Sequence, residues 1–264
     1  MTRIEARFQK LKSEKRGAFI PYLTAGDPSA EVTFNLVLAL EKAGADIIEL
    51  GVPFSDPIAD GPVIQRATER ALAAHMTLRK VLELVRKIRS QSEIPLLLMS
   101  YYNPMLRYGL AKLARDAAQS GLDGVLATDL TVEESGEFRR IMTAENLNTV
   151  FLAAPTSSPE RLKKIAETSS GFIYAVSRTG VTGESQDLSL DLQGFLQSLR
   201  RYSDAPIAVG FGISQPEHVR SVWKAAEGAV VGSAIVRKIE DNLKNADLVD
   251  RVATFARWLK DGTA

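Results

Sequence analysis

Cysteine is absent from this sequence of 264 residues, which excludes disulfides, thiolate metal sites and a cysteine nucleophile. No apolar run approaches the roughly 20 residues that a membrane-spanning helix needs. The formal net charge is only +1, so the chain lacks the basic excess that binds nucleic acid or an anionic membrane. We therefore expect no nucleic-acid partner and no membrane partner.

The N-terminal segment, residues 1–8, is amphipathic and charged, without the apolar core of a signal peptide. We therefore expect a cytoplasmic protein. Hydrophobic residues make up 45% of the chain and charged residues 25%, which is ordinary for a globular protein. No linker, low-complexity tract or change in composition interrupts the sequence, which predicts one domain over residues 1–264.

Eight short apolar segments, rich in β-branched residues, predict eight β-strands. They are too short for helices, and they lack the polar alternation of a strand with one solvated face, as expected of strands covered on both faces. In chain order they span residues 18–23, 46–50, 95–99, 124–127, 149–153, 172–176, 206–209 and 229–231.

Segments with a helical period lie between the predicted strands, and two of them, residues 62–74 and 77–89, separate strands two and three. Strict alternation of strand and helix predicts a parallel sheet. Eight strands in about 250 residues is the size of a closed (β/α)₈ barrel. The fold class is therefore α/β, a (β/α)₈ TIM barrel with extra helices at the N-terminus and between strands 2 and 3.

The carboxyl ends of the strands, where such barrels place their active sites, carry no lysine, which disfavours a Schiff-base aldolase. Neither histidine stands there either. His75 lies between two helical segments and His218 lies one turn into the helix after strand seven, so both are expected to pack or to face solvent. A metal would need carboxylates alone, and we expect none. The groups left for catalysis at these strand ends are therefore carboxylates, tyrosines and backbone amides.

Two carboxylates stand out after the second strand. Glu49 shares one side of the pleat with Ile47 and Gly51. If that side faces the barrel mouth, partial desolvation should raise the pKa of Glu49 toward a value useful for proton transfer. Asp60 follows a loop that Pro53 and Pro57 stiffen. The alternatives are a structural carboxylate at Glu49 and a helix cap at Asp60.

Glycine-rich turns after strands seven and eight, residues 210–214 and 228–234, predict a phosphate site. Glycine lets the backbone approach a ligand closely, and amides at the start of a short helix at Ser233 suit an anion. This is also the usual phosphate position in barrels of this kind. The alternative is that these glycines serve only tight turns.

Six motifs, in order along nearly the whole chain, resemble the α subunit of tryptophan synthase. They lie at residues 19–28, 49–65, 101–104, 177–183, 210–214 and 231–236. The resemblance implies a carbon–carbon lyase that cleaves indole-3-glycerol phosphate to indole and glyceraldehyde 3-phosphate. The indole would pass to a β subunit for the synthesis of L-tryptophan.

The resemblance also implies roles for individual residues. Glu49 would be the general acid/base, which protonates the indole ring carbon and takes the proton of the side-chain hydroxyl. Asp60 would stabilise positive charge on the indole nitrogen, and Tyr174 would support catalysis. This agrees with the missing lysine, because a ring-protonated indole is its own electron sink.

The substrate-binding positions that the resemblance implies surround this pair of carboxylates. Four of them would hold the phosphate, and two belong to the polar loop 177–188, a predicted lid, where Thr182 would bond Asp60 on closure. The full set is Tyr22, Ile64, Tyr101, Asp129, Thr182 and Gly183, with Phe211, Gly212, Gly232 and Ser233 as the phosphate positions.

A β subunit is the implied partner, in an α2β2 heterotetramer, and its contact surface would include Pro53, Asp56, Asn103 and Pro104. No cofactor is expected in this chain, since pyridoxal phosphate would belong to the β subunit. Two alternatives are a stand-alone lyase that releases free indole and a non-catalytic regulatory barrel subunit, against which the intact carboxylates argue. Another phosphosugar barrel, such as an isomerase, would share the phosphate loops but not the spacing of the carboxylates.

Two positions depart from the usual pattern of this family. Thr131 stands where proline is typical, and it could alter a loop expected to touch the partner. Tyr22 stands where phenylalanine is common, and it adds a hydroxyl group beside the indole pocket.

Overall fold

The computed structural model describes residues 1–176, 190–210 and 212–262. Within them, nine strand segments pair in parallel in the order β5-β4-β3-β2-β1-β9-β8-β7-β6. Their bounds are β1 Ala18–Thr24, β2 Ile48–Gly51, β3 Leu96–Ser100, β4 Gly124–Ala127, β5 Asn148–Thr149, β6 Leu152–Ala153, β7 Ile173–Val176, β8 Ile207–Gly210 and β9 Gly228–Val231.

The first and last segments of this order, β5 and β6, are two parts of one barrel strand. Between them, the amide of Val150 donates to the carbonyl of Val125, at 3.0 Å, and the carbonyl of Phe151 accepts from the amide of Tyr174, at 3.1 Å. The segment therefore bonds to β4 on one side and to β7 on the other, which closes the sheet. The predicted eight-stranded barrel is confirmed, with its fifth strand in two pieces.

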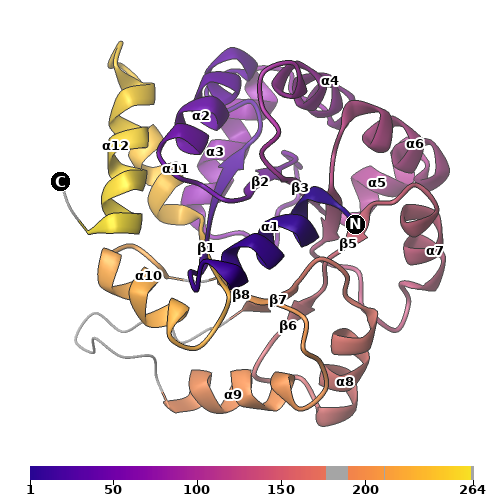
Figure 1. The fold of residues 1–264 in the computed structure, drawn as a ribbon. Helices are drawn as coiled ribbons and strands as arrows, with labels where there is room; N and C mark the ends of the chain where they lie inside the picture. Colours follow the sequence, from indigo (N-terminus) through magenta and orange to yellow (C-terminus); the bar gives the residue numbers. More distant parts are fainter. Residues whose placement is uncertain (177–189, 211, 263–264) are drawn as a thin grey trace.

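Helices form a ring around this barrel (Figure 1). The two helices predicted between the second and third strands are confirmed as α3 and α4. The bounds are α2 Ala30–Lys42, α3 Pro62–Ala73, α4 Leu78–Arg89, α5 Tyr102–Tyr108, α6 Leu110–Ser120, α7 Gly136–Ala144, α8 Pro159–Thr168, α9 Leu190–Arg200, α10 Pro216–Trp223, α11 Ser233–Glu240 and α12 Leu248–Asp261. No helix of the described residues is long and apolar enough to cross a membrane.

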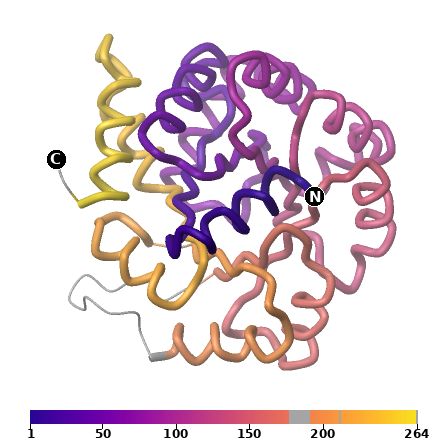
Figure 2. The backbone as a smooth tube through the Cα atoms, in the orientation of Figure 1, coloured from indigo at the N-terminus to yellow at the C-terminus, as the bar shows by residue number. Residues whose placement is uncertain are grey.

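The predicted N-terminal helix, α1 (Arg3–Ser13), closes the amino end of the barrel. A capping box between Thr2 and Glu5 starts it. It buries Ile4, Phe8 and Leu11 in the same cluster as side chains from the inside of the barrel, and the rings of Phe8 and Phe172 lie 5.7 Å apart. Figures 1 and 2 show α1 crossing the centre of the ring of helices. Access to the interior is therefore from the carboxyl end.

Side chains alternate along each strand between the barrel interior and the surrounding helices. The interior cluster takes every second residue: Ala18, Ile20, Ile47, Leu97, Leu126, Val150, Phe172, Ala208 and Val230. The alternate residues, such as Phe19 and Ile48, join the larger cluster that includes the helices. Glu49, two residues after Ile47 on the same side of the pleat, therefore points to the interior; the sequence had left open which way that side faces.

Carboxylates brace the amino ends of two strands. Asp46 accepts from the amide of Phe19 and Asp123 from that of Leu96, both at 2.8 Å. Arg16 bonds the first carboxylate and Arg89 the second. These buried acids are fully engaged and serve the fold.

Candidate active site

A cavity of about 920 Å³ opens at the carboxyl ends of the strands. We call this end of the barrel the mouth. It brings together eight of the predicted site residues from five parts of the chain: Tyr22, Glu49, Asp60, Ile64, Tyr174, Gly212, Gly232 and Ser233. Its volume lies within the range of small-molecule sites. The parallel register places Tyr22 directly opposite Glu49 on neighbouring strands.

Glu49 is the buried acid of this cavity. Its side chain is 1% exposed, and neither carboxylate oxygen has a hydrogen-bond partner within good geometry among the described residues. Burial raises its pKa from 4.5 to about 8; the hydroxyl of Tyr174 lowers it in part, and the nearby charge of Asp60 adds to the rise. A carboxyl group with this pKa can give and take a proton near neutral pH.

Asp60 stands at the entrance to α3, just before the N-cap Gly61. Its amide bonds the carbonyl of Pro57, and its own carbonyl accepts from the side chain of Gln65. Partial burial raises its pKa to about 6, against the opposing effect of the Tyr101 hydroxyl. Its carboxylate is therefore largely ionised at neutral pH, while the carboxyl of Glu49 is largely protonated.

Two tyrosines lean over glycines on neighbouring strands. A Cβ atom on Gly51 would lie 2.0 Å from the hydroxyl of Tyr22, and one on Gly210 would lie 2.6 Å from the hydroxyl of Tyr174. Both phenols have a raised pKa, mainly through burial and then through the charges of the nearby carboxylates. The glycines therefore make room for two neutral hydroxyl groups beside the acids.

Three of the predicted phosphate positions, Gly212, Gly232 and Ser233, line the same cavity, and we call them the phosphate cradle. Gly232 is the N-cap residue of α11 and Ser233 its first residue, so the first amides of this helix have no acceptor within it. Gly212 has a φ of +70°, in the left-handed region that favours glycine. Close by, the amide of Ser214 donates to Nδ1 of His218, at 3.3 Å, so this buried histidine holds the loop, in line with its predicted packing role.

Other predicted site residues do not line the cavity or lie outside the described residues. Tyr101 does not line the cavity but accepts from the amide of Ala59, at 2.9 Å, and its ring lies 5.3 Å from that of Phe54. Asp129 is exposed and accepts from the amide of Tyr102 at 2.6 Å. Thr182, Gly183 and Phe211, and with them the predicted lid 177–188, lie outside the described residues.

The predicted partner residues lie on the loop after β2 and at the start of α5. Asp56 and Asn103 are exposed, Pro104 is partly buried and Pro53 is buried. Sequence reasoning missed two large apolar side chains beside them: Ile58 is 88% exposed and Leu106 is 49% exposed.

Sequence reasoning also missed much of the cavity lining. Met99 and Leu152 line it from strands β3 and β6, and the two-residue alternation from Leu97 and Val150 could have found them. Others line it from the last two helices, among them Lys238, Phe255 and Trp258. No local motif marks these, because the packing of α11 against α12 brings them to the cavity.

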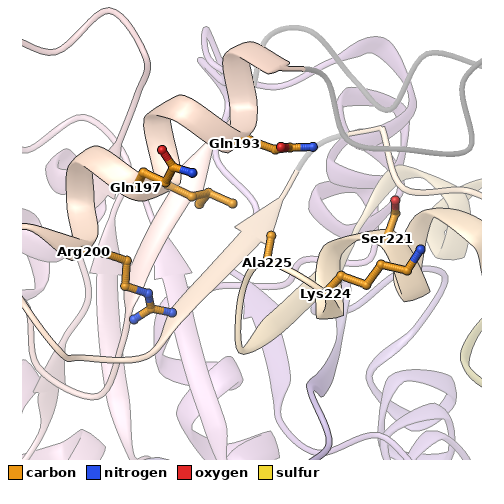
Figure 3. Close-up of a pocket in the computed structure, with 7 residues that line it drawn as sticks. Gln193, Gln197, Arg200, Ser221, Lys224 and Ala225 are labelled. Atoms are coloured by element: carbon orange, nitrogen blue, oxygen red, sulfur yellow. The ribbon is translucent and has the colours of Figure 1, made fainter.

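A second hollow, of about 390 Å³, lies between α9 and α10 (Figure 3). Gln193, Gln197 and Arg200 line one side, and Ser221 and Lys224 the other. Among the described residues its lining holds no carboxylate, whereas the cavity at the mouth holds two, Glu49 and Asp60. Across the described ranges, no group of three or more histidine, aspartate or glutamate side chains is placed to hold a metal ion.

Comparisons with known proteins agree with this geometry. The family model of the tryptophan synthase alpha chain matches residues 8–264. The tryptophan synthase alpha chain of Solibacter usitatus is 56% identical over 262 residues, which cover 99% of this chain and 98% of that one. That of Geotalea daltonii is 47% identical over 264 residues, covering 100% of both chains.

Solved structures give the same result. The crystal structure of tryptophan synthase subunit alpha from Legionella pneumophila matches with a TM-score of 0.91 at 37% identity, covering 100% of both chains. A chain in a structure of the tryptophan synthase α2β2 complex from the hyperthermophile Pyrococcus furiosus matches with a TM-score of 0.87 at 42% identity, covering 94% of this chain and 98% of that one. The chain therefore belongs to the tryptophan synthase alpha chain family.

Proposed function

We propose that Glu49 and Asp60 carry out the cleavage of indole-3-glycerol phosphate to indole and glyceraldehyde 3-phosphate in this chain. The family is the one that the sequence motifs predicted, so the chain is a lyase of tryptophan biosynthesis. The observation that carries the roles is the buried carboxyl group of Glu49, which faces a substrate-sized cavity and has no hydrogen-bond partner of good geometry among the described residues. Buried polar groups are normally satisfied, so an unsatisfied one at the mouth indicates a task that substrate completes.

The protonation states suit a retro-aldol reaction. Glu49, with a pKa of about 8, donates its proton to the indole ring carbon that bears the side chain. The ionised Asp60 then stabilises the positive charge on the ring nitrogen. The Glu49 carboxylate takes the proton of the adjacent side-chain hydroxyl, the carbon–carbon bond breaks, and its electrons return to the ring. Indole and the aldehyde leave, and Glu49 is protonated again.

The phosphate would bind where α11 begins. Gly212, Gly232 and Ser233 line the cavity there, and unpaired amides with the positive end of the helix dipole favour an anion. This leaves the indole ring between the carboxylates and Tyr22. We assign Tyr174 a supporting role, because its hydroxyl acts on the pKa of Glu49.

The replacement Glu49→Gln tests the acid–base role. It nearly preserves shape but removes the titrating group, so kcat for indole release should fall by at least about 100-fold, the lower end for a lost general acid. Binding of inorganic phosphate should change little. Glu83→Gln, at an exposed position on α4, is the control and should keep full activity. An active Glu49→Gln enzyme would refute the role of Glu49.

We further propose that this chain works with a tryptophan synthase β subunit as an α2β2 complex in the cytoplasm, and that pyridoxal phosphate resides in that subunit. The related complex from Pyrococcus furiosus supports this. The exposed Asp56, Ile58, Asn103 and Leu106 form a candidate contact surface next to the mouth. Mixing the purified chains should give a stable complex and faster cleavage, whereas a stand-alone lyase would turn over equally fast without the partner.

A further inference from the structure

Two helices of the mouth begin at the parts of the proposed site that handle opposite ends of the substrate. α3 begins just after Asp60, with Pro62 as its first residue. α11 begins with Ser233, in the proposed phosphate cradle. The two helices pack against each other, so their relative position sets the distance between the two ends of the site.

An ion-pair network joins these helices outside the cavity. Arg70 on α3 donates to both carboxylate oxygens of Asp27, at 2.7 and 2.9 Å, and to Glu240 at 2.9 Å. Glu240, the last residue of α11, also accepts two bonds from Arg66, both of 2.7 Å. None of these four side chains lines the cavity.

The network reaches a third element of the mouth. Asp27 lies in the turn after β1, is 1% exposed, and is held by the fork of Arg70. Hydrogen bonds from Arg66, and then from Arg70, lower the pKa of Glu240 to about 2, so this carboxylate stays charged at neutral pH. An apolar cluster lies on the cavity side of the contact between α3 and α11. Its residues are Tyr22, Val63, Ile64, Ala67 and Val236.

We propose that Glu240 and Arg70 are positioning residues that hold α11 in place against α3 and so fix the distance between the phosphate cradle and Asp60. The inference rests on the proposed function, because it concerns where the two ends of that substrate lie. It assigns a task in the reaction to side chains that touch neither substrate nor cavity.

The length of α11 explains why an anchor at its far end matters. Glu240 is seven positions after Ser233, about 10 Å along the helix axis. Binding of the phosphate can accelerate the reaction at the indole end only if the two parts of the site keep their separation. A displacement of about 1 Å can cost roughly 100-fold in rate.

The negative charge of Glu240, considered alone, predicts the opposite effect of its removal on phosphate binding. Glu240 is an anion, about one Debye length from Ser233 at physiological salt. Removing its charge would therefore leave phosphate binding unchanged or slightly stronger. A smaller contribution of the phosphate to catalysis would instead report a shift in position.

The test compares two substrates in the full chain with its partner subunit at saturation. The ratio of kcat/KM for indole-3-glycerol phosphate to that for the dephosphorylated analogue, indole-3-glycerol, measures what the phosphate contributes. In Glu240→Gln we expect this ratio to fall about tenfold, within the roughly 100-fold limit of a 1 Å displacement. Asp247→Asn, which breaks the exposed pair of Asp247 with Arg251 next to α12, is the control and should keep the ratio.

Arg66→Gln is a second variant, since Arg66 is half exposed and its loss removes only part of the network. It should lower the ratio in the same direction but by less. An unchanged ratio in Glu240→Gln, or an equal loss with both substrates as general structural damage would give, overturns the inference. A wild-type chain that does not cleave the phosphorylated substrate would instead refute the proposed function.

Discussion

Asp46 and Glu49 show how surroundings divide the roles of two buried acids three positions apart. Asp46 is 2% exposed and engages the amide of Phe19 and the guanidinium of Arg16. Glu49 is 1% exposed, but its carboxylate oxygens have no hydrogen-bond partner of good geometry among the described residues. The exposed fraction alone would therefore not distinguish the roles of the two acids. The satisfied acid holds the amino end of the barrel, and the unsatisfied one faces the cavity.

The two acids of the mouth predict a bell-shaped pH dependence of kcat/KM. The reaction needs Glu49 protonated and Asp60 ionised, and their pKa values are about 8 and about 6. Activity should therefore fall as the pH rises above about 8 and as it drops below about 6. Initial rates between about pH 5 and 10 measure this, and the residual activity of Asp60→Asn should lack the acid limb. A flat profile would contradict the assignment.

The raised pKa of Glu49 also predicts a pH-dependent cost in stability. Below pH 4.5 the carboxyl is protonated in both the folded and the unfolded chain, and it contributes no difference. Between 4.5 and about 8 the unfolded chain releases the proton and the folded chain keeps it. The free energy of unfolding should therefore fall by about 1.4 kcal/mol per pH unit in that window. Glu49→Gln should be more stable than the wild type at pH 8, with the difference gone near pH 4, in urea unfolding measurements.

At the scale of the elements, the strands and the ring of helices could be predicted because their signals are local. Burial on both faces gave apolar runs such as residues 124–127, which the structure matches as β4. The side of the pleat that Glu49 occupies could be predicted, but not the direction in which that side faces. The contact of Asp129 with the start of α5 could not be predicted, since it depends on the backbone amide of Tyr102, which lies 27 positions away in the sequence. The pairing of Arg70 with Glu240, 170 positions apart, likewise follows only from the packing of α3 on α11.

The braces at the amino ends of the strands predict a loss of stability without a loss of chemistry. Asp46→Ala removes the acceptor of the buried Phe19 amide and leaves Arg16 with only its longer ion pair to Glu14, at 3.6 Å, and its bond to a backbone carbonyl. The lost acceptor should cost about 2 kcal/mol of unfolding free energy. The kcat/KM of the remaining folded enzyme should stay within about threefold of the wild type, because Asp46 lies at the end opposite the mouth. Urea unfolding and a rate assay at low temperature check both. Asp247→Asn, at an exposed pair, should cost at most about 1 kcal/mol.

At the scale of the whole molecule, the barrel is closed at its amino end and open at its carboxyl end. α1 fills the amino end with Ile4, Phe8 and Leu11, so ligands reach the barrel interior from the mouth. There the loop after β2 joins the start of the β3 loop through the bond from the amide of Ala59 to Tyr101. A partner that moves this loop would also move Asp60, one residue further along the chain. We therefore expect a β subunit bound at the candidate contact surface to affect the chemistry at Asp60 through this short segment.

The exposed side chain of Ile58 on this loop provides the test at this scale. It is 88% exposed, and burying a side chain of this size against a partner contributes about 1.5–3 kcal/mol. Ile58→Ser should therefore weaken binding of the β subunit by at least about tenfold, measured by calorimetry, while cleavage by the isolated chain stays nearly unchanged. Leu243→Ser, at another exposed apolar position (37%) after α11, is the control and should bind normally. Equal affinity of the Ile58 variant would place the partner surface elsewhere on the molecule.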